Sequence, residues 1–258
     1  MRAGSLSVRL ARSAEEVDAA QALRYQMFYT EMGARADAVT LSSQRDRDRF
    51  DPHADHLVVI DDAAAGLSCG IVATYRLINR ATAERLGGFY SAAEFDLRPL
   101  LSCGDTLLEL GRSCVHPRYR SGVVMQLLWR GLAEYVHINA IDILFGCASL
   151  PGTDPGRVAD QLAYLQQNHL APAAQRPQAL PDRFIDMQRD IGDAPDARRT
   201  FLTLPPLIKG YVRIGAWVGE GAVIDTQFNT IDVAIVLRSD LVKRSYLRHY
   251  AQSDINAA

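Results

Sequence analysis

The sequence predicts an α/β or α+β fold in which a central mixed sheet is flanked by helices. Strand-like and helix-like segments alternate along most of the chain, and the first strands are expected to pair as antiparallel neighbours. The 258 residues are 48% apolar, which is sufficient for one large core. No linker-like stretch divides them, so we expect a single domain over residues 1–258.

The first elements follow from local patterns. Leu6–Leu10 alternates apolar and polar residues, which is typical of a strand. Ser13 and Glu16 have the spacing of a capping box, in which each side chain satisfies the backbone N–H of the other residue. A helix is therefore predicted to begin after Ser13, to run to about Met32 and to end at Gly33.

The middle of the chain contains a charged run followed by four regular segments. The polar stretch Arg35–Asp55 predicts an irregular segment. Leu57–Ile60 and Ile71–Leu77 are separated by turn residues, which predicts a hairpin. Thr106–Val115 is predicted as a strand, and the apolar spacing in Val123–Val136 predicts a helix.

The last third of the chain is less uniform. Ile141–Ser149 is apolar enough for a buried strand, and Asp154–Pro155 is typical of a helix start. Leu170–Arg199 is rich in Pro, Ala and Gln and supports no assignment. Tyr211–Val218 and Ile231–Leu237 are predicted as the final strands.

Composition excludes several classes of protein. The formal net charge of −2 lacks the basic excess of a nucleic-acid binder, so we expect no nucleic-acid partner. Four cysteines without a C-x-x-C pair fit neither a zinc ribbon nor a disulfide scaffold, and Cys114 and Cys147 are expected as buried thiols. His53 and His56 lack further ligands at useful spacing, so no metal is expected. No signal peptide or apolar run of ~20 residues is present, which predicts a cytoplasmic protein.

The stretch Thr106–Gly122 carries most of the functional information. Glu109 and Arg112 stand inside an otherwise apolar strand, where a charge is costly unless it is solvated, paired or functional. Side chains alternate along a strand, so these two face opposite sides unless a bulge intervenes. The turn Arg118–Gly122 then brings arginines and a glycine to the start of a helix, where free N–H groups favour a phosphate.

This strand, turn and helix are similar to the acyl-donor-binding segment of the GNAT N-acyltransferase superfamily. The ordered series Arg24-x-x-x-Phe28, Asp46-x-Asp48-x-Phe50-Asp51, Arg76 and Glu109-x-x-Arg112 resembles the acyl-homoserine-lactone synthases. A likeness that runs from about Leu23 to Leu237 is to the bacterial L-ornithine N-alpha-acyltransferases. Its matching segments are Arg24–Phe28, Gly87–Tyr90, Glu94–Leu97, Glu109–Val115, Leu127–Leu132, Phe145–Ser149, Pro151–Pro155, Leu204–Tyr211 and Gln227–Thr230.

The resemblance implies a GNAT-like acyl-CoA N-acyltransferase fold and a specific reaction. A 3-hydroxyacyl chain would pass from acyl carrier protein to the α-amine of L-ornithine and give lyso-ornithine lipid. The 4′-phosphopantetheine thioester of the carrier is then a co-substrate, no cofactor is bound, and the lipid product implies peripheral contact with the inner face of the membrane.

Other functions stay open at this point. One is an acyl-homoserine-lactone synthase, although the tryptophan that those enzymes carry shortly after Phe28 is missing. A CoA-dependent acetyltransferase is disfavoured by the shortened glycine turn, and another amino-acid N-acyltransferase is a further alternative. A non-catalytic, membrane-associated haemolysin-like protein is the alternative from a different class.

Aminolysis of a thioester requires a neutral amine and a stabilised oxyanion. Glu109 is the candidate general base, because this strand lines the acyl-donor cleft in the superfamily. A backbone N–H of Ser113, Cys114 or Val115 is the candidate oxyanion donor, and Arg112 completes the predicted catalytic set.

Substrate groups call for fixed charges. Arg24, Arg76 and Arg112 are candidates for binding the amino-acid carboxylate, since a guanidinium can bind it in bidentate fashion. Asp48 and Asp51 either receive the δ-ammonium of ornithine or hold those arginines in place. Phe28 belongs to the core or to the wall of the acyl-chain tunnel. The residues expected to meet the phosphopantetheine phosphate or the acidic carrier protein are Arg118, Arg120 and Gly122.

Overall fold

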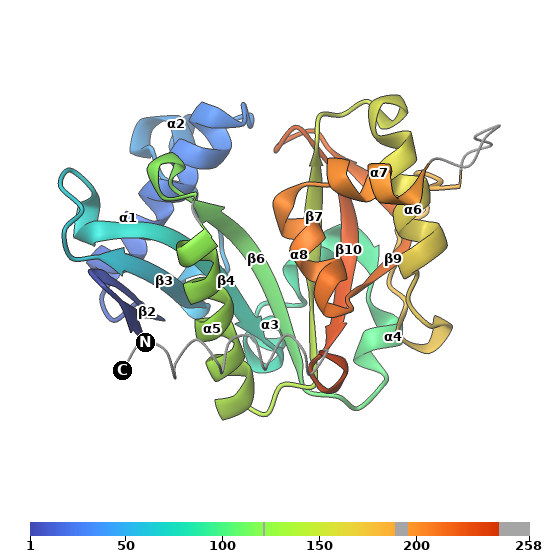
Figure 1. Cartoon of the computed structure of the whole chain (residues 1–258), viewed down its shortest axis with the longest axis horizontal. Helices are drawn as coiled ribbons and strands as arrows, with labels where there is room; N and C mark the ends of the chain where they lie inside the picture. Colours follow the sequence, from blue (N-terminus) through green and yellow to red (C-terminus); the bar gives the residue numbers. More distant parts are fainter. Residues whose placement is uncertain (121, 189–195, 243–258) are drawn as a thin grey trace. The chain divides into compact units, whose positions relative to one another are not determined.

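The computed structural model describes residues 1–120, 122–188 and 196–242, and Figure 1 shows the elements along the chain. The chain divides into two compact units. Unit 1 comprises Met1–Tyr90 and Leu108–Ala140, and unit 2 comprises Ser91–Leu107 and Ile141–Ala258. Each unit combines strands with helices, which confirms the predicted fold class, whereas the expectation of a single domain stays a prediction.

Unit 1 is built on antiparallel strands in the order β1-β2-β3-β4-β6. The strands are β1 (Arg2–Ala3), β2 (Leu6–Leu10), β3 (Asp55–Asp61), β4 (Ile71–Asn79) and β6 (Leu107–Val115). The helices are α1 (Ala14–Tyr25), the π-helix η1 (Gln26–Glu31), α2 (Ala38–Ser43), η2 (Asp51–His53), η3 (Ser68–Gly70), α3 (Arg80–Arg85), η5 (Pro117–Tyr119) and α5 (Gly122–Ile138).

Helices α1 and α5 cover opposite faces of this sheet. Helix α1 packs against Val58 and Ile60 in one core cluster. Helix α5 packs against Leu57 so closely that a Cβ on Gly131 would lie 2.7 Å from Val8 and 3.1 Å from Leu57. Consecutive residues of β3 point to opposite faces, so the two helices lie on different sides. We call the side covered by α1 the α1 face.

Unit 2 is a mixed sheet with strand order β7-β10-β9-β8-β5. Strands β7, β10 and β9 pair antiparallel, while β8 runs parallel to β9. The strands are β5 (Phe95–Asp96), β7 (Ile143–Pro151), β8 (Gln178–Ala179), β9 (Trp217–Asp225) and β10 (Thr230–Arg238). The helices are η4 (Tyr90–Ala93), α4 (Arg98–Leu101), η6 (Pro155–Val158), α6 (Ala159–His169), η7 (Ala173–Gln175), α7 (Ala197–Thr203), α8 (Pro206–Ile214) and η8 (Ser239–Leu241).

Most predicted elements are confirmed, but the expected strand over Tyr211–Val218 is wrong. Its first half belongs to α8, which begins with Pro206 and ends at Gly215 in the left-handed conformation, with φ of 100°. Proline at a helix start and glycine just after its end are strong local signals. They override the strand-like apolar run, and β9 begins only at Trp217.

Two N-terminal predictions also need correction. Ser13 accepts a hydrogen bond from the Glu16 N–H at 3.3 Å, but the Glu16 carboxylate accepts from the Arg12 N–H, so the capping box is only half formed. The charged run is not irregular throughout, because Asp37 accepts from the Thr40 N–H at 2.7 Å and starts α2.

None of the helices in the described residues combines the length and the apolar character that are needed to cross a bilayer.

Candidate active site

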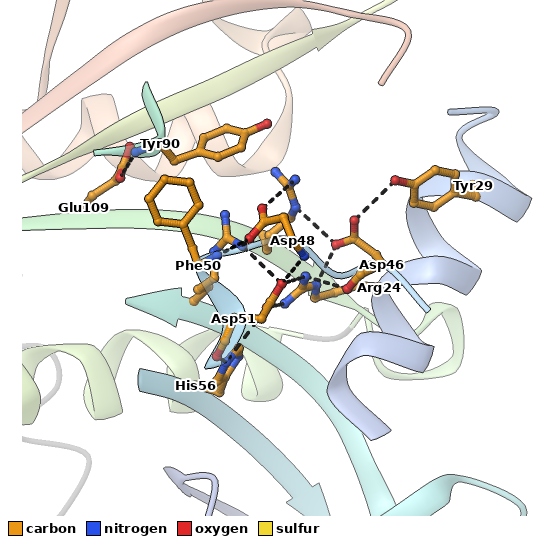
Figure 2. A network of polar contacts seen from close by, with 11 residues as sticks. Arg24, Tyr29, Asp46, Asp48, Phe50, Asp51, His56, Tyr90 and Glu109 are labelled. Atoms are coloured by element: carbon orange, nitrogen blue, oxygen red, sulfur yellow. Dashed lines mark hydrogen bonds and ion pairs between the residues drawn. The ribbon is translucent and has the colours of Figure 1, made fainter. Parts of the chain in front are cut away.

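A cluster of arginines and aspartates lies on the α1 face of unit 1, and Figure 2 shows it from close by. Its carboxylates come from the charged loop before β3, and its guanidinium groups come from α1, β4 and β6. The cluster pairs three arginines with three aspartates: Arg24, Arg76, Arg112, Asp46, Asp48 and Asp51. The arginines and aspartates of the sequence motif therefore form one network of ion pairs in the folded protein.

Arg24 is fully enclosed in this cluster, with 0% of its side chain exposed. Its Nε donates to Asp46 Oδ2 at 2.6 Å, and its Nη1 donates to Asp51 Oδ1 at 2.5 Å. Its Nη2 donates to the Asp46 carbonyl at 2.6 Å and to Asp51 Oδ2 at 3.1 Å. Arg24 therefore joins the loop to α1, and these contacts make it a positioning residue; a direct contact with substrate stays a prediction.

The loop is also held by its own carboxylates. Asp51 accepts a hydrogen bond from the Asp48 N–H at 2.7 Å, and Asp48 accepts one from the Phe50 N–H at 2.8 Å. His56 Nε2 lies 2.9 Å from the Asp51 carbonyl, which fixes the start of β3. These contacts explain why a run so rich in charge is ordered: the carboxylates of Asp48 and Asp51 each satisfy a backbone donor as well as a guanidinium.

Arg76 lies between carboxylates and aromatic rings and is 1% exposed. Its Nη1 is 2.7 Å from Asp48 Oδ1 and 3.4 Å from Asp51 Oδ2. Its guanidinium carbon lies 5.6 Å from the centre of the Phe50 ring and 5.4 Å from that of Tyr90. Cation–π contacts of this kind stabilise a guanidinium removed from water.

Arg112 reaches the same carboxylates from β6. Its Nε lies 3.1 Å from Asp46 Oδ2, and its Nη2 lies 3.4 Å from Asp48 Oδ2. Its guanidinium carbon is 4.7 Å from the centre of the Tyr90 ring. With 11% of its side chain exposed, Arg112 is more accessible than Arg24 or Arg76.

A bulge in β6 makes this contact geometrically feasible. Arg76 is paired with Gly111 and Thr74 with Cys114, so one residue more is used on β6 than on β4. Arg112 lies in this extra step and has a positive φ of 51°. The sequence predicts that Glu109 and Arg112 face opposite sides of the sheet unless a bulge intervenes. The bulge is present, and it turns the Arg112 side chain to the other side.

Glu109 lies on the α1 face, because it is paired with Ile78, two positions along β4 from Arg76. The bulge thus gives Glu109 and Arg112 access to the same side of the sheet. Glu109 is 2% exposed, and its Oε2 accepts a hydrogen bond from the Tyr90 backbone N–H at 2.7 Å (Figure 2). The carboxylate is thus fixed in orientation; its role as base stays a prediction.

Beyond the bulge, the backbone N–H groups of β6 point in different directions, which distinguishes the candidate oxyanion donors. His116 donates its N–H to Val72 of β4 at 2.8 Å, and Cys114 is paired with Thr74 two positions away. Hydrogen-bonded pairs alternate along an antiparallel ladder, so Cys114 also directs its N–H to β4. The Val115 N–H points away from β4, which makes it a better candidate donor than that of Cys114.

The Cys114 side chain is part of the core cluster under α1. Burial raises the pKa of its thiol to about 12. This confirms the predicted buried thiol and excludes the sulfur as a ready nucleophile. The same prediction is wrong for Cys147, which is only half-buried. Ser113 is half-buried within the bulge. Phe28, also half-buried, packs against the same core cluster, so its predicted contact with the acyl chain stays a prediction.

The turn after β6 presents two exposed arginines at the start of α5. Arg120 pairs with Glu31 through its Nη1 and Nη2 atoms, at 2.6 and 2.8 Å, and its Nε lies 3.3 Å from the Val115 carbonyl. Arg118 is exposed, and Gly122 begins α5 with open space where a Cβ would stand. This turn is close to the bulge in sequence and structure, but phosphate binding stays a prediction.

The charges in the cluster lower the pKa of two carboxyl groups, those of Asp46 and Asp48. Burial disfavours the ionised form of Asp48, but Arg76 and Arg112 outweigh it and hold the pKa at about 2. Burial likewise opposes ionisation of Asp46, and the charges of Arg112 and Arg24 lower its pKa all the same. Both aspartates are therefore ionised at neutral pH.

This shift predicts the effect of Asp48→Asn on stability. The pKa of Asp48 is lower in the folded protein than in the unfolded chain. The ionised carboxylate therefore stabilises the folded state fully at pH values above the pKa of the unfolded chain, and this stabilisation is lost as the pH falls to about 2. The variant should lose about 2 kcal/mol of unfolding free energy at pH 6 relative to wild type. Urea titrations at several pH values measure this difference, which should shrink as the pH falls from 4 towards 2. A constant difference over that range would contradict the ion-pair explanation.

Sequence reasoning gave no role to several residues that the structure singles out. Asp46 was part of the matched motif, yet its bridge between Arg24 and Arg112 follows only from the folded loop. Tyr90 was likewise part of a matched segment, and it contributes a backbone donor to Glu109 and a ring to the arginines. The glycine pair before it was the available signal for a turn at this position.

In unit 2, Glu94, Cys147 and Asp232 bring three side-chain ligand atoms within 4.8 Å of one another. His53 and His56, which were considered as metal ligands, do not form such a group in the described part of the chain. The expectation that no metal is bound stays a prediction.

Comparison with known proteins identifies the class to which this chain belongs. Residues 23–130 match the acetyltransferase (GNAT) domain family. A solved N-acyl amino acid synthase from uncultured soil microbes is 14% identical, covers 91% of each chain and has a TM-score of 0.49. The chain therefore contains an acetyltransferase (GNAT) domain.

The particular family follows from two full-length relatives. An L-ornithine N(alpha)-acyltransferase of Rhodobacter capsulatus is 42% identical over 96% of this chain and 95% of its own length. The enzyme of the same name from Brucella abortus is 44% identical over 96% of this chain and 90% of its own length. The chain belongs to the L-ornithine N(alpha)-acyltransferase family.

Proposed function

We propose that the protein transfers a 3-hydroxyacyl chain from acyl carrier protein to the α-amine of L-ornithine and so forms lyso-ornithine lipid. The observation that carries this proposal is the 42% identity over nearly the full length to a relative that bears this enzyme name. The protein would act in the cytoplasm, and a product with one long acyl chain would be released at the inner membrane face.

Glu109 is the proposed general base. The α-ammonium of an amino acid must lose a proton before its nitrogen can attack a thioester, and a positioned carboxylate can accept it. The N–C bond then forms, the carbonyl oxygen becomes an oxyanion, and collapse of this intermediate breaks the C–S bond. Glu109 passes the first proton to solvent and accepts a second one from the nitrogen, which is positively charged once the N–C bond has formed. The released phosphopantetheine thiolate takes up this second proton.

The Val115 N–H is the proposed oxyanion donor, because it points away from β4. Such a donor acts more strongly on the oxyanion than on the neutral carbonyl of the thioester. Comparable donors accelerate acyl transfer by roughly 10²–10³-fold.

Arg112 is the proposed contact for the amino-acid carboxylate. Its side chain retains exposure, and its Nε and Nη2 are only moderately close to Asp46 and Asp48, at 3.1 and 3.4 Å. Arg24 and Arg76, by contrast, are enclosed and hold the aspartates that orient Arg112. Arg112 would therefore bind the substrate, and Arg24 and Arg76 would position Arg112.

Arg118, Arg120 and Gly122 are the proposed binding site for the phosphate of phosphopantetheine. Arg120 has to exchange its ion pair with Glu31 for the phosphate, or hold both. Arg120→Ala should therefore raise the KM for acyl carrier protein about tenfold with little change in kcat, and more strongly at low salt than at high salt. Steady-state kinetics at two ionic strengths measure this effect. A KM equal to that of wild type would show that Arg120 is part of the turn and does not contact the carrier.

A panel of acyl donors and acceptors tests the proposed function. Purified protein is incubated with 3-hydroxyacyl carrier protein or acetyl-CoA as donor. The acceptor is L-ornithine, L-lysine, L-glutamine, glycine or S-adenosylmethionine, and the products are identified by mass spectrometry. We expect an acyl-ornithine product. Consumption of S-adenosylmethionine would instead indicate a homoserine-lactone synthase. Use of acetyl-CoA in place of the carrier protein would indicate a CoA-dependent acetyltransferase.

A further inference from the structure

Helix α2 (Ala38–Ser43) of unit 1 is exposed although it carries no charged side chain. Val39 is 59% exposed and Leu41 58%, and Thr40 is the buried residue of the helix. Met32, which lies shortly before the helix in the sequence, is a further large apolar residue at 42% exposure. Exposed apolar residues that occur singly are normal, but a group of them in one short segment indicates a contact surface.

Exposed arginines flank this helix on both sides in the sequence. Arg35 precedes it, and Arg47 and Arg49 follow it. Within the part of the chain that the structure describes, none of the three forms an ion pair, and the Arg49 guanidinium lies 4.9 Å from the centre of the Phe50 ring. Their charges are therefore available to an anionic partner. The term α2 surface is used below for Met32, Arg35, Val39, Leu41, Arg47 and Arg49.

Acidic side chains near the α2 surface do not cancel its positive charge. Glu31 already pairs with Arg120 at 2.6 Å, and Asp18 pairs with Arg45 at 2.8 Å. Asp37 is exposed, and its carboxylate caps the start of α2. One carboxylate without a basic partner thus opposes three arginines, so the α2 surface attracts anions.

The directions of Val39 and Leu41 indicate which kind of partner fits. Each residue of an α-helix turns by about 100° around the helix axis, so residues two positions apart point to nearly opposite sides. Both side chains are exposed, while Thr40 between them is buried against unit 1. A rigid protein that lay on one side of so short a helix would cover one of the two. A fluid lipid surface surrounds the helix and receives both.

We propose that the α2 surface binds the protein to a membrane that contains anionic lipids. Its apolar side chains enter the interface between headgroups and acyl chains, and its arginines meet the lipid phosphates. This inference deepens the proposed function, in which the product is released at a membrane, and it names the residues that make the contact. Binding to the membrane requires neither substrate, so it can be measured apart from acyl transfer.

Sedimentation with lipid vesicles tests this inference on the full chain without substrates. One set of vesicles contains equimolar phosphatidylethanolamine and phosphatidylglycerol, and the other contains phosphatidylcholine alone. We expect the wild type to bind the anionic vesicles, more weakly as the salt concentration rises, and to bind the neutral vesicles far less. The double variants Val39→Ser/Leu41→Ser and Arg35→Gln/Arg47→Gln should each bind the anionic vesicles at least tenfold more weakly.

Ile138→Ser is the matched control for the apolar variant. Ile138 is 71% exposed and is the last residue of α5, while Figure 1 shows α2 at the end of unit 1 where α5 begins. This variant should bind vesicles as the wild type does. All three variants should keep the wild-type unfolding temperature and, without vesicles, the wild-type rate of acyl transfer, because none of the substituted residues belongs to the cluster of arginines and aspartates.

Several results would overturn the inference and leave the proposed acyl transfer intact. One is a wild type that binds neither kind of vesicle, and another is an equal loss of binding in Ile138→Ser. If the wild type binds no vesicles and the double variants raise the KM for acyl carrier protein, the α2 surface binds the carrier instead. A dimer of the wild type that the double variants lose in sedimentation velocity would assign it to a second copy of the chain. Vesicle binding as expected without acyl transfer to any amino acid would support the inference and overturn the proposed function.

Discussion

Glu109→Gln is expected to lower kcat at least 100-fold and to leave the fold unchanged. The glutamine oxygen can still accept the Tyr90 N–H, so the local structure is retained. The amide cannot take a proton from the incoming ammonium, and the loss matches the roughly 10²–10⁴-fold contribution of a general base. Single-turnover acyl transfer and thermal unfolding measure the two effects separately.

Glu134→Gln is the matched control for this variant, because Glu134 is an exposed glutamate on α5. It should keep wild-type turnover. If Glu109→Gln also kept near-normal turnover, Glu109 would be a structural acceptor for the Tyr90 N–H and the base would have to be another group.

Arg24→Met is expected to destabilise unit 1 strongly. The substitution leaves Asp46 and Asp51 buried without the guanidinium that holds them, and removal of one partner from a buried ion pair costs about 3–5 kcal/mol. Arg24→Lys should lose less, because it retains the charge but not the forked geometry. Urea unfolding at neutral pH measures both variants.

Arg45→Met provides the comparison at an exposed ion pair. Arg45 also binds a carboxylate through two nitrogens, that of Asp18, at 2.8 and 2.9 Å, but this pair is solvent-accessible. Its loss should cost less than about 1 kcal/mol. Similar losses for Arg24→Met and Arg45→Met would show that burial does not determine the strength of the cluster.

The sequence predicted much of unit 1 because its signals are local. The alternation in β2, the hairpin of β3 and β4, and the apolar spacing in α5 each lie within one short window. The charged motif also converged as expected, since Arg24, Asp51 and Arg76 meet in the folded chain. The bulge had to be left conditional, because a bulge depends on the pairing of two strands.

Unit 2 was harder to predict because its cluster of polar side chains depends on contacts between distant segments. Glu94, Cys147 and Asp232 are far apart in sequence, and their approach follows from the register of β7 with β10 and from the position of η4. No local pattern indicates that approach. The amphipathic α8 was missed for a different reason: its apolar residues, such as Tyr211 and Val212, are also common in strands.

The most direct test of the account uses ornithine labelled with nitrogen-15 at the α position. Purified protein receives this substrate and 3-hydroxyacyl carrier protein, and tandem mass spectrometry locates the label in the product. We predict a single acyl group whose amide nitrogen is the labelled one, and cleavage of one thioester for each amide formed. An acyl group on the unlabelled side-chain nitrogen, or thioester hydrolysis without any amide, would contradict it.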